Sequence, residues 1–366
     1  MRTYARIDRR ILQENYQSIQ RAVGPDVAIL AVVKADAYGH GAVEVARALS
    51  DAGAAHFAVA YLGEAVSLRE AGVAGGIVVL GGAEAGEEPC FRTQRLTPFI
   101  HTPEQLCAWE REAAASGERL GCHLEIDSGM NRLGLPADAA VLAEWIGSAP
   151  HLEIEGLATH LASAEDFRSG QAEEQRQRFL AVAAALRERG IGCGRLHLSN
   201  SAAIAYRPEW TADMVRPGLA LYGYLSPALG PAPPARIDVR PALEWKSRIL
   251  AVREAAAGAK LGYQGAFTAQ SPMRLAVVSA GYGDGLNRHM SNGGTVLVRG
   301  LRRPIVGLVS MELTLVDVTR LDDIEAGEEV TLIGNGLDAW EMSRQCGSIA
   351  YEALCGISSR VPRVYV

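Results

Sequence analysis

Residues 27–41 read VAILAVVKADAYGHG, an apolar run that ends directly at Lys34. A short apolar run bounded by turn-forming residues is typical of a buried strand. Lys34 is also one of only three lysines among the 36 Lys and Arg residues. Unlike Arg, a Lys in apolar surroundings can lose its proton and become a nucleophilic amine. The stretch therefore predicts a buried strand with a reactive amine at its carboxyl end. For Lys246 and Lys260, a coding bias against lysine explains the scarcity equally well.

Working outward, the first two-thirds of the chain alternates apolar runs with helical segments such as 41–52, 103–115 and 171–189. The predicted strands are 27–33, 55–60, 76–80, 96–100, 121–126, 153–159, 195–198 and 212–215. Strand–helix alternation predicts a parallel sheet covered by helices, and eight units in roughly 220 residues match a (β/α)8 barrel, which typically has ~250 residues. An open doubly wound sheet is the alternative.

The pattern changes at SPALGPAPPARIDVRPALEW (226–245), where repeated prolines stop both helix and strand. Beyond it, turn-forming residues separate short apolar runs, at 247–252, 273–279, 294–299, 304–308, 313–318 and 329–333. We expect an α/β fold with a barrel over 11–230. A C-terminal all-β domain is expected over 231–366, joined by an N-terminal strand within 1–10.

Composition excludes several classes of protein. A net charge of −6 without a basic run argues against a nucleic-acid-binding protein. No apolar run approaches the ~20 residues that span a bilayer, and no apolar segment follows the N-terminal charges as in a secretory signal. The six cysteines are scattered without a CxxC pair, which favours reduced thiols in the cytoplasm over disulfides or a zinc site.

Polar residues follow five of the predicted barrel strands. They are Lys34 and Tyr38, then Asp127 and Arg132, then His160, then His197, Asn200 and Ser201, and finally Arg216. Because the carboxyl ends of barrel strands share one face, we expect these side chains to meet at one rim. Taken singly, His160 could be a core residue, Asn200 a helix cap and Arg216 an ion-pair partner. The combination favours an active site.

The chemistry of this rim indicates a cofactor. A Lys amine suits Schiff-base formation. Backbone N–H groups near Gly218 and at the helix start beside Ser201 suit a phosphate, which barrels often bind in this region. The two together predict pyridoxal 5'-phosphate. A sugar-phosphate aldolase is the alternative, although aldolases rarely need an appended β domain.

AVVKADAYGHG, IDSGMNRLG, ATH at 158–160, SNSAA, VRPGLALYG, SAGYGDGLNR, VGLVSMELT and RVPRVY together resemble the alanine racemase family, in the family's order and over nearly the whole chain. The resemblance implies a pyridoxal-phosphate enzyme with a barrel and a β domain. It also implies a homodimer with shared active sites, because Tyr282 and Met311 would reach the site of the second subunit.

The resemblance implies a role for each matching residue. Lys34 would hold the cofactor as an aldimine and act as one base, with Tyr282 as the opposite base. Arg216 would meet the pyridine nitrogen, and His160 would lie between Arg216 and the tyrosine. The phosphate would be held by Tyr38, Asn200, Ser201, Gly218, Leu219 and Ser359. Arg132, Met311 and Glu312 would serve the substrate.

Elementary chemistry fits these roles. Racemisation removes a proton from one face of Cα and returns it to the other, so two bases on opposite faces are the simpler solution. Arg216 against the ring nitrogen would disfavour ring protonation, because two adjacent positive charges repel each other. We expect this arrangement to limit side reactions such as transamination.

Four positions depart from the family pattern. Glu125 replaces a carbamylated Lys, and we expect it to orient Arg132 by a charge-assisted bond. Glu312 replaces Asp, Leu308 stands where an Arg is common, and Ser359 replaces a Tyr near the phosphate. These changes leave serine or larger amino acids as possible substrates beside alanine.

The expected function is interconversion of L- and D-alanine, supplying D-alanine for peptidoglycan, in the cytoplasm. The alternatives are a racemase of serine or of a broader set of amino acids, a barrel-type decarboxylase, and a non-catalytic pyridoxal-phosphate carrier. A decarboxylase would leave Tyr282 without a role, and a carrier would not need the β domain.

Overall fold

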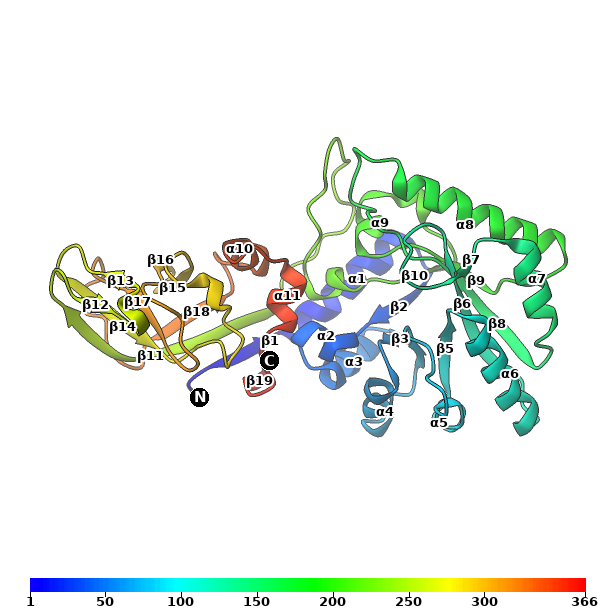
Figure 1. The fold of residues 1–366 in the computed structure, drawn as a ribbon, viewed down its shortest axis with the longest axis horizontal. Helices are drawn as coiled ribbons and strands as arrows, with labels where there is room; N and C mark the ends of the chain where they lie inside the picture. Colours follow the sequence, from blue (N-terminus) through cyan, green and yellow to red (C-terminus); the bar gives the residue numbers. More distant parts are fainter. The chain divides into compact units, whose positions relative to one another are not determined.

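The computed structural model describes residues 1–366 and divides into two compact units (Figure 1). The barrel unit comprises Leu12–Ala37 and Ala42–Arg240. The sheet unit comprises Met1–Ile11, Tyr38–Gly41 and Pro241–Val366. The segment that contains Lys34 therefore contributes to both units, since Lys34 belongs to the barrel unit and Tyr38 to the sheet unit.

Eight parallel strands form the barrel. They are β2 (Ala28–Val32), β3 (His56–Val59), β4 (Gly76–Val79), β5 (Leu96–Ile100), β6 (Leu120–Asp127), β8 (Leu152–Ala158), β9 (Arg195–His197) and β10 (Met214–Val215). From β2 to β9 each strand pairs with the next, and β10 pairs with β2 through Met214 opposite Ala28. A single bridge between Asn200 and Arg216 connects the β9 and β10 ends. This arrangement confirms the predicted barrel and excludes an open doubly wound sheet.

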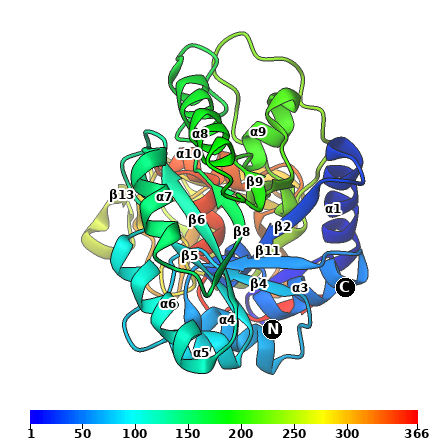
Figure 2. The same cartoon turned by 90° about the vertical axis from the view of Figure 1, so that its right-hand side faces the viewer.

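Helices surround these strands on the outside (Figure 2). They are α1 (Arg9–Val23), α3 (Ala42–Asp51), α4 (Leu62–Glu70), α5 (Glu88–Thr93), α6 (Pro103–Ser116), α7 (Ala139–Gly147), α8 (Gln171–Glu188) and α9 (Ser201–Tyr206). The start of α6 follows the expected pattern, because the Thr102 side chain accepts a hydrogen bond from the Gln105 N–H and Pro103 occupies the first turn. Strand β7 (Leu135–Pro136), which pairs with β6, was not predicted.

The sheet unit is built around the long strand β11 (Leu243–Ala255). The sheet also contains β1 (Tyr4–Ile7), β14 (Met273–Val278), β15 (Thr295–Val298), β16 (Leu301–Pro304), β17 (Thr314–Asp317), β18 (Glu329–Ile333) and β19 (Arg363–Tyr365). All pairings are antiparallel except that of β1 with β19. A small hairpin joins β12 (Lys260–Leu261) to β13 (Phe267–Thr268).

Two features of this unit differ from the sequence-based expectation. The strand expected at 304–308 lies earlier, at Leu301–Pro304, because Arg299 and Gly300 both have positive φ and form a two-residue hairpin turn that pairs Val298 with Leu301. The unit also contains two short helices, α10 (Ala339–Gln345) and α11 (Ala350–Cys355). No helix of the whole structure is both long and apolar enough to cross a membrane.

Candidate active site

Lys34 lies two residues after the buried end of β2 and is half-buried. The next four residues, Ala35–Tyr38, all have φ between 52° and 54° and form a left-handed turn, α2 (Lys34–Gly39). None of the four is glycine, so this backbone conformation is strained at each position. Strain of this kind persists only when neighbouring contacts enforce it.

Two carboxylates enforce the left-handed turn. Glu64 accepts hydrogen bonds from the N–H groups of Ala35 and Ala60, each at 2.7 Å. Asp36 accepts a bond from the Ala42 N–H at 2.8 Å. The backbone on both sides of the turn is therefore fixed. The backbone position from which the Lys34 side chain extends is fixed with it.

Arg132 and His160 lie on neighbouring loops of the barrel rim. The loop of Arg132 is shaped by Asp127, whose Oδ1 accepts bonds from the N–H groups of Gly129 at 2.9 Å and Asn131 at 3.0 Å. His160 is surrounded by cations: burial, aided by the charges of Arg216, Arg132 and Lys34, lowers its pKa to about 3. These electrostatic effects indicate that the four side chains lie close together, as expected if they meet at one rim of the barrel.

Arg216 is buried, yet its guanidinium touches no carboxylate. It donates to the carbonyl oxygens of His197 at 2.7 Å and Thr159 at 2.6 Å, and it lies 3.0 Å from Nδ1 of His197 and 3.5 Å from Nδ1 of His160. Burial lowers its pKa to about 10, against the opposing effect of the Glu125 charge. Arg216 therefore remains a cation at neutral pH with only neutral groups in direct contact.

Backbone N–H groups that follow Arg216 in the chain converge on the Ser201 hydroxyl. The Ser201 hydroxyl accepts hydrogen bonds from the N–H groups of Gly218 at 3.0 Å and Ala220 at 3.1 Å, so two backbone donors converge on one point. Leu219, which lies between these two donors in the chain, begins the 3-10 turn Leu219–Tyr222. Asn200 caps α9 by accepting from the N–H groups of the two residues after Ser201. Its side chain therefore has a structural role in addition to any role toward a ligand.

These features fit pyridoxal phosphate. Convergent backbone N–H groups suit a phosphate. A buried guanidinium with only neutral partners suits an uncharged ring nitrogen, which is an acceptor. A Lys held at the rim suits covalent attachment of an aldehyde.

Glu125 has a partner other than the expected Arg132. Its Oε2 lies 3.0 Å from Nδ1 of His101, whose Nε2 lies 2.8 Å from the Leu80 carbonyl oxygen. Nδ1 of His101 is buried and makes no hydrogen bond with the carboxylate. No hydrogen bond joins Glu125 to Arg132 in this structure. This contact with His101 stands in place of the expected charge-assisted bond between Glu125 and Arg132.

The remaining predicted residues lie in the sheet unit. Tyr38 is buried against the Tyr351 ring, with ring centroids 5.8 Å apart, and burial raises its pKa. Tyr282 and Met311 are exposed by 45% and 53%. The Tyr282 N–H donates to the Ser310 carbonyl oxygen at 3.0 Å, so the two loops lie side by side.

Arg360, which was not predicted, joins three of the family-like motifs. Its Nε donates to Asp284 of SAGYGDG at 2.9 Å, and its Nη2 donates to Glu312 of VSMEL at 2.8 Å. Arg360 itself belongs to the C-terminal motif, next to the exposed Ser359. The longer side chain of Glu312 is therefore accommodated by an ion pair, which lowers the pKa of this carboxyl.

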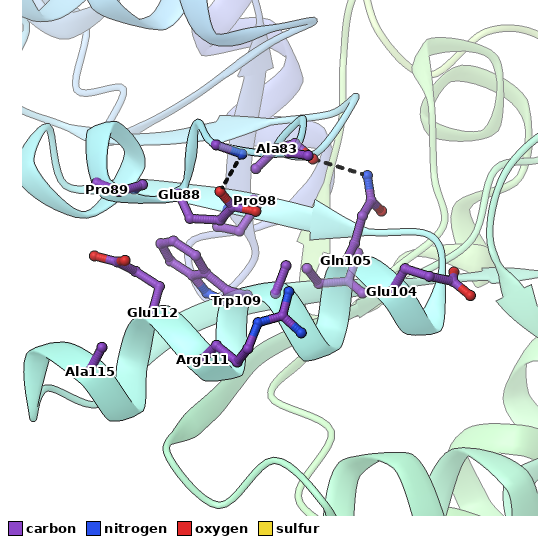
Figure 3. Close-up of a pocket in the computed structure, with 14 residues that line it drawn as sticks. Ala83, Glu88, Pro89, Pro98, Glu104, Gln105, Trp109, Arg111, Glu112 and Ala115 are labelled. Atoms are coloured by element: carbon purple, nitrogen blue, oxygen red, sulfur yellow. Dashed lines mark hydrogen bonds between the residues drawn. The ribbon is translucent and has the colours of Figure 1, made fainter.

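A cavity of about 590 Å³ on the outside of the barrel is not the site. It is lined by α5, β5 and α6, including Pro98, Trp109 and Arg111 (Figure 3). None of the predicted site residues lines this cavity.

Comparisons with known proteins agree with this geometry. Residues 7–226 match the N-terminal domain model of the alanine racemases, and residues 242–365 match the C-terminal domain model. An alanine racemase of Synechocystis is 39% identical over 372 residues, covering 100% of this chain and 99% of the relative. An alanine racemase of Bartonella henselae with covalently bound pyridoxal phosphate superposes with a TM-score of 0.91 at 30% identity, and 100% of each chain is covered.

An alanine racemase of Bacillus anthracis with bound L-Ala-P superposes with a TM-score of 0.92 at 32% identity, covering 100% of this chain and 95% of the other. The two domain models and these full-length matches agree on one assignment. The chain belongs to the alanine racemase family.

Proposed function

We propose that this protein interconverts L- and D-alanine with pyridoxal phosphate as its cofactor. The observation that carries the proposal is the barrel rim, where Lys34, Arg132, His160 and Arg216 follow the carboxyl ends of four barrel strands and Arg216 lies 3.5 Å from His160. When bound, pyridoxal phosphate withdraws electrons from the amino acid attached to it and makes the Cα–H bond acidic. The residues of this chain then have to hold the cofactor, orient the amino acid and move one proton.

The barrel residues divide these tasks. Lys34 binds the cofactor covalently and serves as a base on one face of Cα. Ser201 and the N–H groups at Gly218 and Leu219 bind the phosphate, and Tyr38 and Asn200 support it. Arg216 donates to the ring nitrogen and keeps it unprotonated, because a second positive charge beside a buried guanidinium is unfavourable.

The substrate carboxylate is held by Arg132 and by the Met311 N–H. Tyr282 is the second base, on the opposite face of Cα. Tyr282 and Met311 are exposed in the single chain, as is Leu313 at 38%, and this apolar exposure supports their coverage by a second copy. We therefore include a homodimer with shared sites in the proposal. The setting is cytoplasmic, and D-alanine for peptidoglycan is the proposed product.

The two-base assignment is tested with Tyr282→Phe, with Tyr4→Phe as the control because Tyr4 belongs to the same unit and its hydroxyl donates to Glu329 within the chain at 2.7 Å. Removing a general base costs about 10²–10⁴-fold in rate. Tyr282→Phe should lose racemisation by at least ~100-fold, yet still exchange the Cα proton of one enantiomer with D2O. Tyr4→Phe should behave as wild type in both racemisation and exchange.

Wild type should convert alanine faster than serine or larger amino acids, without releasing gas or amine. Full racemisation by Tyr282→Phe would refute the second base. Gas and amine from any amino acid would instead indicate a decarboxylase. Bound cofactor without turnover would indicate a carrier.

A further inference from the structure

A row of polar groups extends from Arg216 into the middle of the barrel, where apolar side chains are the rule. Nη1 of Arg216 lies 3.0 Å from Nδ1 of His197. Nε2 of His197 lies 2.9 Å from Nδ1 of His123, and Nε2 of His123 lies 3.8 Å from Oε2 of Glu155. Both imidazoles are buried. We name this series Arg216–His197–His123–Glu155 the core-histidine link.

The chemistry of the end groups fixes the direction of the hydrogen bonds. A guanidinium can only donate, so Nδ1 of His197 has to accept and carries no proton. A neutral imidazole then has its proton on Nε2, which donates to Nδ1 of His123. The proton of His123 is consequently on its own Nε2, the nitrogen that faces Glu155. A proton added to Nδ1 of either ring would bring two donors face to face.

The surroundings keep both rings neutral and fixed. Phe99 stacks on His123 with ring centroids 5.7 Å apart and an interplanar angle of 15°, and it meets the edge of His197 at 5.8 Å. Burial, aided by the charge of Arg216, lowers the pKa of His123 to about 3 and that of His197 well below its usual value. Each ring can therefore accept and donate without ever carrying charge.

A glycine makes the contact between the two rings possible. Gly156 of β8 lies opposite His123 of β6 and next to the β9 strand that carries His197. A Cβ at this position would lie 2.5 Å from Nδ1 of His123 and 2.9 Å from Nε2 of His197, the two atoms that share the hydrogen bond. A methyl group there would separate the rings without removing either one.

We propose that His197 and His123 are positioning residues that hold the guanidinium of Arg216 at a fixed orientation, with Gly156 providing the space in which they meet. An imidazole acceptor fixes the direction of the Nη1–H group and leaves the positive charge of Arg216 intact. A carboxylate in contact with Arg216 would neutralise that charge. The carboxylate of Glu155 stays at the far end of the link, where it favours the Nε2–H form of His123. The expected effects on kcat and on transamination rest on the proposed role of Arg216 toward the cofactor, whereas the hydrogen-bond arrangement of the two imidazoles does not.

The direct test is the proton position on each ring. In the wild-type holoenzyme labelled with ¹⁵N-histidine, NMR should show His197 and His123 both unprotonated at Nδ1 and protonated at Nε2. A proton on Nδ1 of either ring would overturn the link, whether or not the enzyme racemises alanine. This measurement therefore separates a failure of the link from a failure of the proposed function.

Three variants test the positioning role. His123→Leu removes the acceptor, Gly156→Ala separates the rings, and His123→Asn keeps an oxygen near the position of Nδ1. Loss of a buried hydrogen bond corresponds to roughly a ten- to hundredfold effect. His123→Leu and Gly156→Ala should lower kcat per cofactor-bound site by roughly this factor, change KM by less than about threefold, and raise transamination per racemisation event.

His123→Asn should restore most of kcat. Gly76→Ala is the matched control, because its Cβ would also meet an imidazole, Nδ1 of His56 at 2.9 Å, outside the link. It should match wild type in kcat and in product ratio. Wild-type kcat in both His123→Leu and Gly156→Ala, or no recovery in His123→Asn, would assign these residues to stability alone and overturn the proposal.

Discussion

Lowering the pH from about 7.5 to about 5.5 should destabilise this protein through three buried histidines. Burial lowers the pKa of His123 and of His160 to about 3 and that of His197 well below the usual 6.5. In the unfolded chain each regains its ordinary pKa. Between these values the unfolded state binds more protons than the native state, so the stabilisation is complete above pH 6.5 and is lost as the pH falls toward 3.

The size of the effect follows from the protonation of the unfolded chain. One pH unit below 6.5, protonation stabilises each unfolded histidine by about 1.4 kcal/mol, so three contribute about 4 kcal/mol. Burial raises the pKa of Glu155, which offsets a small part of this loss. Because typical stabilities are ~5–15 kcal/mol, such a loss is large.

The assay is urea unfolding of the holoenzyme at fixed protein concentration, because ligand binding and assembly both shift apparent stability. The unfolding free energy should fall by about 4 kcal/mol between the two pH values. His160→Gln should reduce this difference by about 1.4 kcal/mol, whereas the exposed His289 replaced by Gln should not change it. A free energy that is constant or rises on acidification would refute the neutral state of the buried rings.

Two further predictions concern stability. Arg69 bonds to four backbone carbonyl oxygens at 2.7–2.9 Å, and Arg69→Lys should cost about 2–4 kcal/mol in urea unfolding because an ammonium cannot span them. The four carbonyls are those of Val73, Gly75, Gln94 and Arg95. Gly39 has a φ of +78°, and a Cβ there would lie 2.3 Å from the Leu354 carbonyl oxygen, so Gly39→Ala should cost at least ~2 kcal/mol in thermal unfolding. Gly53→Ala, with a φ of +100° and open space, is its control. Equal melting temperatures for the two glycine variants would contradict the collision, and a wild-type midpoint for Arg69→Lys would contradict the bridging role.

The barrel strands could be predicted because strands buried on both faces read as continuous apolar runs. The same property hides which side chains face the barrel interior. In β6, His123 and Glu125 are two residues apart and therefore share a face, and the pair Phe99 and His101 follows the same spacing. Polar residues at every second position of a buried strand were the available signal for the core-histidine link.

The left-handed turn after Lys34 could not be predicted from local preferences. Residues 35–38 are Ala, Asp, Ala and Tyr, and such residues rarely have positive φ. The turn depends on Glu64, which is distant in sequence and joins the turn to the end of β3. Helix α1, by contrast, was overlooked although Leu12, Tyr16 and Ile19 recur at helical spacing and are all buried.

Strand register determines which side chain Glu125 contacts, and the spacing of residues along the chain does not reveal it. Ile100, the last residue of β5, lies opposite Leu124 of β6, so the residues that follow them, His101 and Glu125, also come together. The carboxylate is thereby turned toward the neighbouring strand, and its charge raises the pKa of Arg216 against the effect of burial. Glu125 thus acts on the same guanidinium as His197, one through charge at a distance and the other through a neutral contact. A carboxylate in contact with Arg216 would cancel the charge that the guanidinium presents to the ring nitrogen. Glu125 makes no ion pair with Arg216, and its charge favours the cation without cancelling it.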